Sequence, residues 1–269
     1  MKANPTTVGA VVVGVSEYGE AHLIVDLLTA DQGLVRAFAA SARKSRRRFG
    51  GALQPGTRLQ AVLQWTNGRD LAGLREVSVE TPHRGALRTE LSAMLRAGWM
   101  LDLSRSLAGG AQPSREIYEI LNEGLEALDQ GRLPPWGLVA FEVGALATFG
   151  AVPRFDACCA CGTAPKSERA RFSPASGGLA CPSCFPGWGT GDVVLSRATL
   201  RALNSLSEAG DGVSPLARAE YLPEAPDLID EARLALGRCT EYLLGRPLRS
   251  REIMDQLGAE QAATGLVVF

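Results

Sequence analysis

Four cysteines in the second half of the chain have the spacing of a zinc site. They form two pairs with two residues inside each pair and nineteen residues between the pairs: Cys158, Cys161, Cys181 and Cys184. A two-residue gap lets both thiolates of one turn reach the same ion, and two such turns complete a tetrahedron. Because four thiolates leave no position open for water or substrate, we expect a structural Zn²⁺ that holds a small, core-poor segment together.

Two other interpretations of these cysteines stay open. They are either incidental buried thiols or the ligands of an iron–sulfur cluster. Cys159 offers a tighter pairing with Cys161, but we expect Cys158 to be the ligand. The sixth cysteine, Cys239, is expected to be a small core residue on a helix.

A dense cluster of positive charge lies near the N-terminus. Five cations occupy six consecutive positions in a chain whose formal net charge is −1: Arg43, Lys44, Arg46, Arg47 and Arg48. Such a cluster suits a phosphate backbone, which releases counterions when it is neutralised. Five contacts to a single strand predict a log K against log salt slope of up to about −3.5, at ~0.7 per phosphate.

Phe49, Tyr18 or Trp65 would offer rings for base stacking. The alternatives are a solvated loop without a partner and a contact with membrane headgroups.

Signatures of enzymes are absent from the sequence. None of the three lysines follows a glycine, so there is no phosphate-binding P-loop. The two histidines, His22 and His83, lie in neither an H-x-E nor an H-E-x-x-H pattern. We expect His22 to be a residue of the barrel described below whose ring finds its hydrogen-bond partners within the fold. We predict that the protein is not an enzyme.

Composition indicates a folded protein in a reducing compartment. The 269 residues are 46% hydrophobic and 21% charged, which argues against extended disorder. No apolar run reaches the ~18–20 residues that span a bilayer, and the N-terminal "VGAVVVGV" lacks a signal-peptide cleavage site. We therefore expect a cytoplasmic protein without a membrane partner, in which cysteines bind metal rather than form disulfides.

The basic cluster falls between predicted strands. Five short apolar or alternating runs, separated by turn residues, predict strands at 8–15, 21–29, 33–42, 57–65 and 70–80. Asn67-Gly68 between the last two favours a hairpin. Five strands in about seventy residues suit an OB-fold-like barrel, and an SH3-like barrel fits almost as well. The cations would then project from the loop between the third and fourth strands.

Helical periodicity begins near residue 85. Apolar residues recur at helical spacing around 87–101, 117–128, 134–150, 200–206 and 228–243. We predict an α+β fold in which a five-stranded OB-fold-like barrel precedes a helical domain with an inserted zinc knuckle. The expected domains are 1–80 for the barrel, 81–153 and 190–269 for the helical domain, and 154–189 for the knuckle.

The order of these motifs resembles a known family. "YGEAHLIVDLLTADQGLVRAFAASARKSRRRFGGALQPG", residues 18–56, resembles the start of the RecO family of bacterial recombination mediators, and the later "CxxCG…GG…CxxC" resembles its zinc knuckle. Ser41 stands where the family commonly has glycine, and Cys159 is an additional cysteine.

The resemblance implies a function that the residues alone do not show. RecO-like proteins bind single- and double-stranded DNA, anneal complementary strands without ATP, and work with RecR to load RecA onto strands coated by single-stranded-DNA-binding protein (SSB). They dock the acidic, hydrophobic-ended tail of SSB, and they act in the cytoplasm at the nucleoid. Position by position, the resemblance assigns DNA binding to Arg43, Lys44, Arg46, Arg47 and Arg48, and metal binding to the four cysteines.

Two other function classes fit the residues. A zinc-ribbon RNA-binding or transcription-associated factor would combine a barrel and a ribbon as well, but would not anneal DNA strands. A protein-interaction scaffold would keep its nucleic-acid affinity unchanged when Arg46, Arg47 and Arg48 become alanine.

Overall fold

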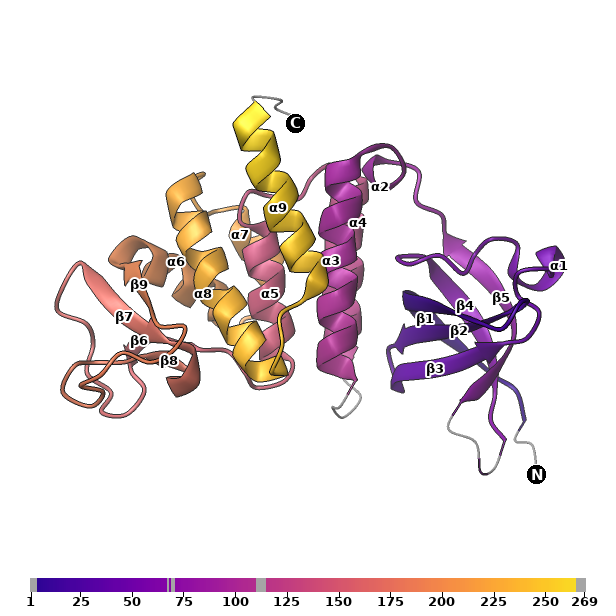
Figure 1. The fold of residues 1–269 in the computed structure, drawn as a ribbon, viewed down its shortest axis with the longest axis horizontal. Coiled ribbons are helices and arrows are strands. Elements are labelled where there is room, and N and C mark those ends of the chain that lie inside the picture. Colours follow the sequence, from indigo (N-terminus) through magenta and orange to yellow (C-terminus); the bar gives the residue numbers. More distant parts are fainter. Residues whose placement is uncertain (1–3, 67, 69–70, 110–114, 265–269) are drawn as a thin grey trace. The chain divides into compact units, whose positions relative to one another are not determined.

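Five strands at the N-terminus form a closed barrel (Figure 1). The computed structural model describes residues 4–66, 68, 71–109 and 115–264. The barrel strands are β1 (Thr6–Tyr18), β2 (His22–Thr29), β3 (Gly33–Ala39), β4 (Arg58–Gln64) and β5 (Ala72–Thr81). Their order around the barrel is β1-β2-β3-β5-β4, and all neighbours are antiparallel except β3 and β5. The predicted five-stranded barrel is confirmed.

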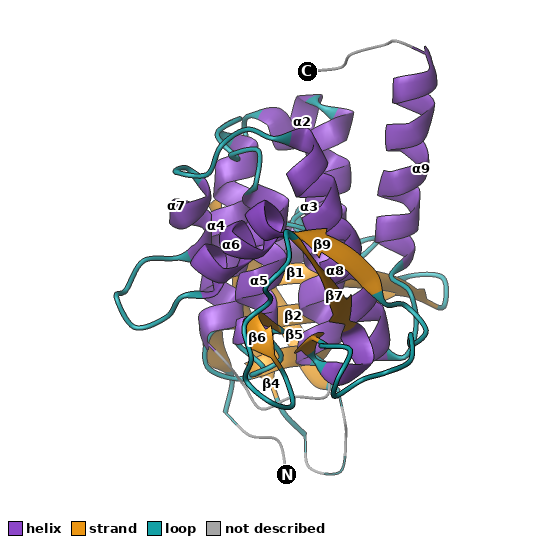
Figure 2. Ribbon diagram, turned by 90° about the vertical axis from the view of Figure 1, so that its left-hand side faces the viewer, coloured by secondary structure: helices purple, strands orange, loops and turns teal. Residues whose placement is uncertain are grey.

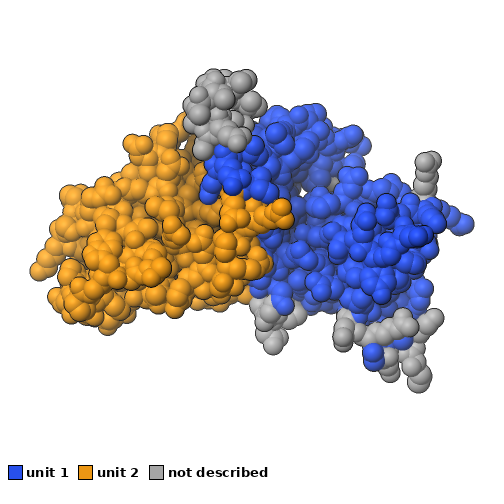
Figure 3. Space-filling model, viewed as in Figure 1, with its two compact units in different colours: residues 1–132, 253–269 blue, residues 133–252 orange. Residues whose placement is uncertain are grey.

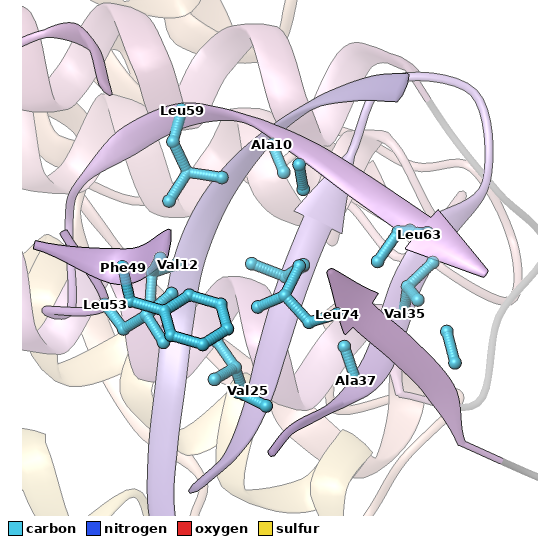
Figure 4. Close-up of a cluster of buried hydrophobic side chains, with 14 residues drawn as sticks. Ala10, Val12, Val25, Val35, Ala37, Phe49, Leu53, Leu59, Leu63 and Leu74 are labelled. Carbon is cyan, nitrogen blue, oxygen red and sulfur yellow. The ribbon is translucent and has the colours of Figure 1, made fainter. Parts of the chain in front are cut away.

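The side-chain alternation of the strands produces the barrel core. In β4 every second residue is buried, as expected for a strand with one face inward. Figure 4 shows the cluster of 14 buried side chains inside the barrel, most of which are Val, Leu and Ala. The predicted hairpin joins β4 to β5. Gly68 in its turn has φ +76°, whereas Asn67 lies outside the described residues.

Three helices follow the barrel in the first part of the chain. They are α2 (Ala86–Thr89), α3 (Leu91–Ala108) and α4 (Arg115–Asp129). A buried carboxylate in β2 links α3 to the barrel, because Asp26 accepts from Arg105 of α3 at 2.5 Å and from Arg36 of β3 at 2.9 Å. Strand β1 carries a bulge next to Gly14, where an added Cβ would lie 3.1 Å from Nε of Arg105. The glycine therefore leaves room for the arginine to reach Asp26.

The chain divides into two compact units, shown in different colours in Figure 3. Unit 1 comprises residues 1–132 and 253–269, and unit 2 comprises residues 133–252. Helices α2–α4 thus belong to the same compact unit as the barrel. The division into a barrel, a helical domain and a knuckle, which the sequence suggested, stays a prediction.

Three helices contact the buried helix α5 (Gly137–Ala147) in unit 2. They are α6 (Arg197–Ser207), α7 (Pro215–Ala219) and α8 (Pro226–Leu244). Glu142 of α5 is fully buried and accepts from Thr240 Oγ1 at 2.7 Å and from Arg251 Nη1 at 3.0 Å. Arg251 lies in the first turn of α9 (Arg249–Thr264). The buried charge is paired and hydrogen-bonded, as burial of a carboxylate requires.

A small sheet accompanies the helices of unit 2. Its strands are β6 (Arg154–Cys158), β7 (Arg169–Ser173), β8 (Gly178–Leu179) and β9 (Val193–Ser196), in the order β6-β8-β7-β9. Strands β7 and β9 lie side by side in Figure 2, beside long loops. Gly177, with φ +72°, and Gly178, with φ +148°, lie where the chain turns from β7 into the antiparallel strand β8. The periodicity of the sequence indicated neither α7 nor α9.

The predicted helices are confirmed as α3, α4, α5, α6 and α8. Gly150 after α5 has φ +64°, and this left-handed backbone ends the helix. Among the helices in the described part of the chain, none combines the length and the apolar character that crossing a bilayer demands.

Candidate nucleic-acid interface and metal centre

The basic cluster lies where the sequence predicted it, between β3 and β4. Arg43 and Lys44 lie in a turn, and the following residues form a one-turn helix, α1 (Arg46–Phe49). This helix differs from the expected irregular loop. It ends at Gly50, which has φ +49° and is followed by Gly51 at φ +81°. The two glycines next to the cations therefore supply the left-handed backbone that terminates the helix.

Hydrogen bonds hold the backbone of this segment, which we call the basic loop (residues 41–51), against the β1–β2 hairpin. The amide of Ser41 donates to Nδ1 of His22 at 2.9 Å, and the amide of Arg43 donates to the carbonyl of Ala21 at 3.2 Å. The carbonyl of Ser41 accepts from the amides of Lys44 and Ser45. His22 is thus the satisfied barrel residue that the sequence predicted, and it positions the basic loop.

The described cations of the basic loop fall into two groups. Arg43, Lys44 and Arg47 are exposed, and Arg43 lies 3.3 Å from the carboxylate of Glu17. Arg48 is half-buried and turned inward: it donates to the carbonyl of Ala40 at 2.5 Å and to Ser45 Oγ at 3.1 Å. The side chain of Arg46 lies outside the described residues.

Of the aromatic residues proposed for stacking, Phe49 is not available. Its side chain is 3% exposed and belongs to the barrel core, where Figure 4 shows it beside Val12, Val25 and Leu53. The suggestion that Phe49 stacks on bases is therefore wrong, because α1 directs this ring into the barrel. Trp65 is partly buried against the same core, whereas Tyr18 is 56% exposed.

The four predicted cysteine ligands come together in unit 2. Cys158 ends β6, Cys161 follows in the adjacent turn, and Cys181 and Cys184 lie in the loop after β8. Their sulfur atoms all lie within 4.8 Å of one another, and Cys161 and Cys181 are 3.8 Å apart. Cys159 is not part of the group, so the fold brings together the four cysteines whose spacing the sequence singled out. Cys239 is buried in α8, and burial raises the pKa of its thiol to about 12.

The electrostatics of the cluster fit a bound cation. Hydrogen bonds from the amides of Cys161 and Cys181 lower the pKa of Cys158 to about 6. Hydrogen bonds between the sulfur of Cys184 and those of Cys161 and Cys181 raise the pKa of Cys184 to about 12. Neighbouring thiolates at this spacing oppose the ionisation of the last one, and a metal cation removes that opposition. Four sulfurs converging from two turns can therefore hold a metal ion.

The sequence did not reveal every residue that supports these sites. The contacts of Ala21 and His22 with the basic loop join residues about twenty positions apart, for which local periodicity contains no signal. In the knuckle, Arg171 donates to the carbonyls of Phe185 and Gly187 and so holds the loop after the cysteines. Its place in a "RAR" segment of alternating residues was the only available indication.

Both halves of the chain match models of one protein family. Residues 1–83 match the model described as "Recombination protein O N terminal", and residues 88–252 match "Recombination protein O C terminal". The two matches cover the barrel with the basic loop and the segment with the four cysteines.

Curated relatives extend over nearly the whole chain. This chain is 44% identical to a "DNA repair protein RecO" of Anaeromyxobacter sp. (strain K), over 92% of its own length and 95% of that protein. It is 38% identical to the protein of that name from Myxococcus xanthus, over 93% and 97%, and 36% identical to that of Geobacter sulfurreducens, over 94% and 99%. With its barrel, its helices and its cysteine cluster, the chain therefore belongs to the RecO family of DNA repair proteins.

Proposed function

We propose that this protein binds single- and double-stranded DNA through its basic loop and anneals complementary strands without ATP. The observation that carries the proposal is the set of exposed cations Arg43, Lys44 and Arg47, held on a hydrogen-bonded loop of the barrel. Arg46 completes the set by sequence, and Arg48 contributes charge while it shapes the loop. Phosphates would replace Glu17 as the counterion of Arg43.

The role in recombinational repair includes protein partners. We propose that the protein acts with RecR to load RecA onto strands coated by SSB, and that it docks the SSB tail on its helices. It would do so as a non-enzymatic factor of the cytoplasm, at the nucleoid. Family membership supports these partners, and the absence of a nucleotide-binding P-loop from the sequence agrees with work without ATP.

We further propose that the metal is Zn²⁺, bound by Cys158, Cys161, Cys181 and Cys184 in a structural role. Four thiolates at this spacing are typical of closed zinc sites. Zinc supplies cross-links between the turn after β6 and the loop after β8.

The central test replaces Arg43, Lys44 and Arg47 by alanine in the full-length chain. Loss of about three phosphate contacts reduces the slope of log K against log salt by about 2 for single strands, and lowers affinity at about 50 mM salt by at least about tenfold. Annealing of complementary oligonucleotides slows in parallel. Fluorescence anisotropy and a strand-annealing assay measure both effects.

A matched control removes the same charge elsewhere. Arg96, Arg132 and Arg201 are exposed residues outside the basic loop, and their triple alanine variant is expected to keep the salt slope. Equal losses in the two triple variants would show that only net charge matters. A wild-type protein that binds no oligonucleotide in dilute buffer would overturn the proposed function itself.

A further inference from the structure

Three rings form an aromatic corner (Tyr18, His22 and Phe38) on the outside of the barrel. Tyr18 ends β1 and is paired with His22, the first residue of β2, while Ile24 of β2 is paired with Phe38 of β3. The rings of Tyr18 and Phe38 meet edge to face at 5.7 Å, and those of His22 and Phe38 lie 5.2 Å apart. Their neighbours in sequence, such as Ala37 and Ala39, belong to the barrel core. The alternation of strands therefore directs the aromatic corner away from the core.

The three rings lie outside the hydrophobic core of the barrel and are at least partly exposed to solvent. Tyr18 is 56% exposed, and His22 and Phe38 are partly exposed. None of the three belongs to the core cluster or to the residues packed against it. An exposed tyrosine supported by two further rings presents a rigid apolar surface to solvent at little conformational cost.

The aromatic corner and the basic loop share one end of the barrel. His22 contributes its ring to the corner and accepts the amide of Ser41, the first residue of the basic loop. The carbonyl of Ala21 accepts the amide of Arg43, and Glu17, next to Tyr18, lies 3.3 Å from the guanidinium of Arg43. A ring surface and exposed cations are therefore connected by direct contacts rather than by sequence proximity.

We propose that the aromatic corner is a stacking platform for unpaired bases, with Tyr18 as the ring that contacts the base and with Phe38 and His22 as its support. This inference rests on the proposed function, in which the basic loop binds the phosphates of the same strand. Bases of a single strand can turn towards a ring, whereas bases in a duplex are already stacked on one another. The platform thus makes the interface prefer single-stranded over double-stranded nucleic acid, which phosphate contacts alone do not achieve.

The test compares Tyr18→Ala and Tyr18→Phe with the wild-type full-length chain. Fluorescence anisotropy is measured on an oligothymidine strand, on a mixed-sequence duplex of equal length, and on an equally long abasic strand, at several salt concentrations. Tyr18→Ala is expected to weaken binding to the oligothymidine about five- to fifty-fold. Its affinities for the duplex and the abasic strand change less than about twofold, and the salt slope is unchanged because no phosphate contact is lost. Tyr18→Phe keeps the ring and retains wild-type affinity.

Each outcome distinguishes the platform from the basic loop. If wild-type protein binds all three ligands in a manner that depends on Arg43, Lys44 and Arg47, and Tyr18→Ala behaves like wild type, the platform is wrong and the proposed function stands. Equal weakening on oligothymidine, duplex and abasic strand would also reject the platform, because it would indicate a disturbed basic loop. Because Phe38 is partly buried, Phe38→Leu serves as a second variant, with its thermal unfolding recorded alongside. It is expected to weaken binding to the oligothymidine less than Tyr18→Ala does.

Discussion

At the scale of single residues, neighbouring cations of the basic loop have different surroundings. Arg47 is exposed, whereas Arg48 lies with its guanidinium carbon 4.9 Å from the ring centre of Phe49 and donates to the carbonyl of Ala40. A cation that satisfies a backbone carbonyl and covers a core aromatic ring stabilises the folded loop. Two adjacent arginines of equal charge can therefore be separated by experiment.

Arg47→Ala and Arg48→Ala form such a pair. Arg48→Ala is expected to lower the free energy of unfolding by about 0.5–1.5 kcal/mol through the lost hydrogen bonds. Arg47→Ala leaves that free energy unchanged and reduces the single-strand salt slope by about 0.7. Urea unfolding and anisotropy titrations measure these quantities. Equal destabilisation by both substitutions would contradict the assignment of Arg48 to the loop's own structure.

At the scale of elements, the small sheet of unit 2 places the two cysteine pairs. Strand β8 contains only Gly178 and Leu179, and it lies between β6, which ends at Cys158, and β7. Gly178 has φ +148°, and an added Cβ would overlap the backbone of Arg154. This close approach brings the loop of Cys181 next to the turn that follows Cys158.

Gly178→Ala is therefore expected to separate β8 from β6 and to disrupt the proposed metal site. Purified variant protein should contain less than about half an equivalent of zinc, and its thermal unfolding should begin earlier, because the cysteine cluster contributes folding energy through the metal. Gly187→Ala is the control, since an added Cβ there meets open space. Normal zinc content in Gly178→Ala would show that the sheet does not position the ligands.

At the scale of the whole molecule, the proposed tasks fall into different compact units. The barrel, the basic loop and the aromatic corner belong to unit 1, and the four cysteines belong to unit 2. The metal site proposed for the four cysteines is closed by its thiolates, so its expected role is to cross-link the chain within unit 2. Folding of unit 2 and DNA binding by unit 1 are thus expected to respond separately to metal removal.

Treatment with a strong zinc chelator tests this separation. We expect protease cleavage between residues 158 and 192 to accelerate, while affinity for an oligothymidine strand changes less than about twofold. Restoring Zn²⁺ reverses the change, and Cys158→Ser reproduces it without chelator. A loss of DNA affinity in proportion to the zinc removed would refute the division of tasks.

The sequence by itself determined the features that depend on local patterns. Alternation and turn residues identified the five barrel strands, and helical periodicity identified five longer helices. The two C-x2-C pairs singled out the four cysteines that the fold brings together. An element too short to show a period, such as α7, escaped prediction.

Only the tertiary structure decided which side of each element faces the interior. Tertiary contacts place the ring of Phe49 in the barrel core and turn Arg48 towards the carbonyl of Ala40. They also bring the ring of His22 to the amide of Ser41. The same contacts group Tyr18 with Phe38 from a different strand. These outcomes depend on contacts between residues distant in sequence and on the closure of the barrel, neither of which a local pattern contains.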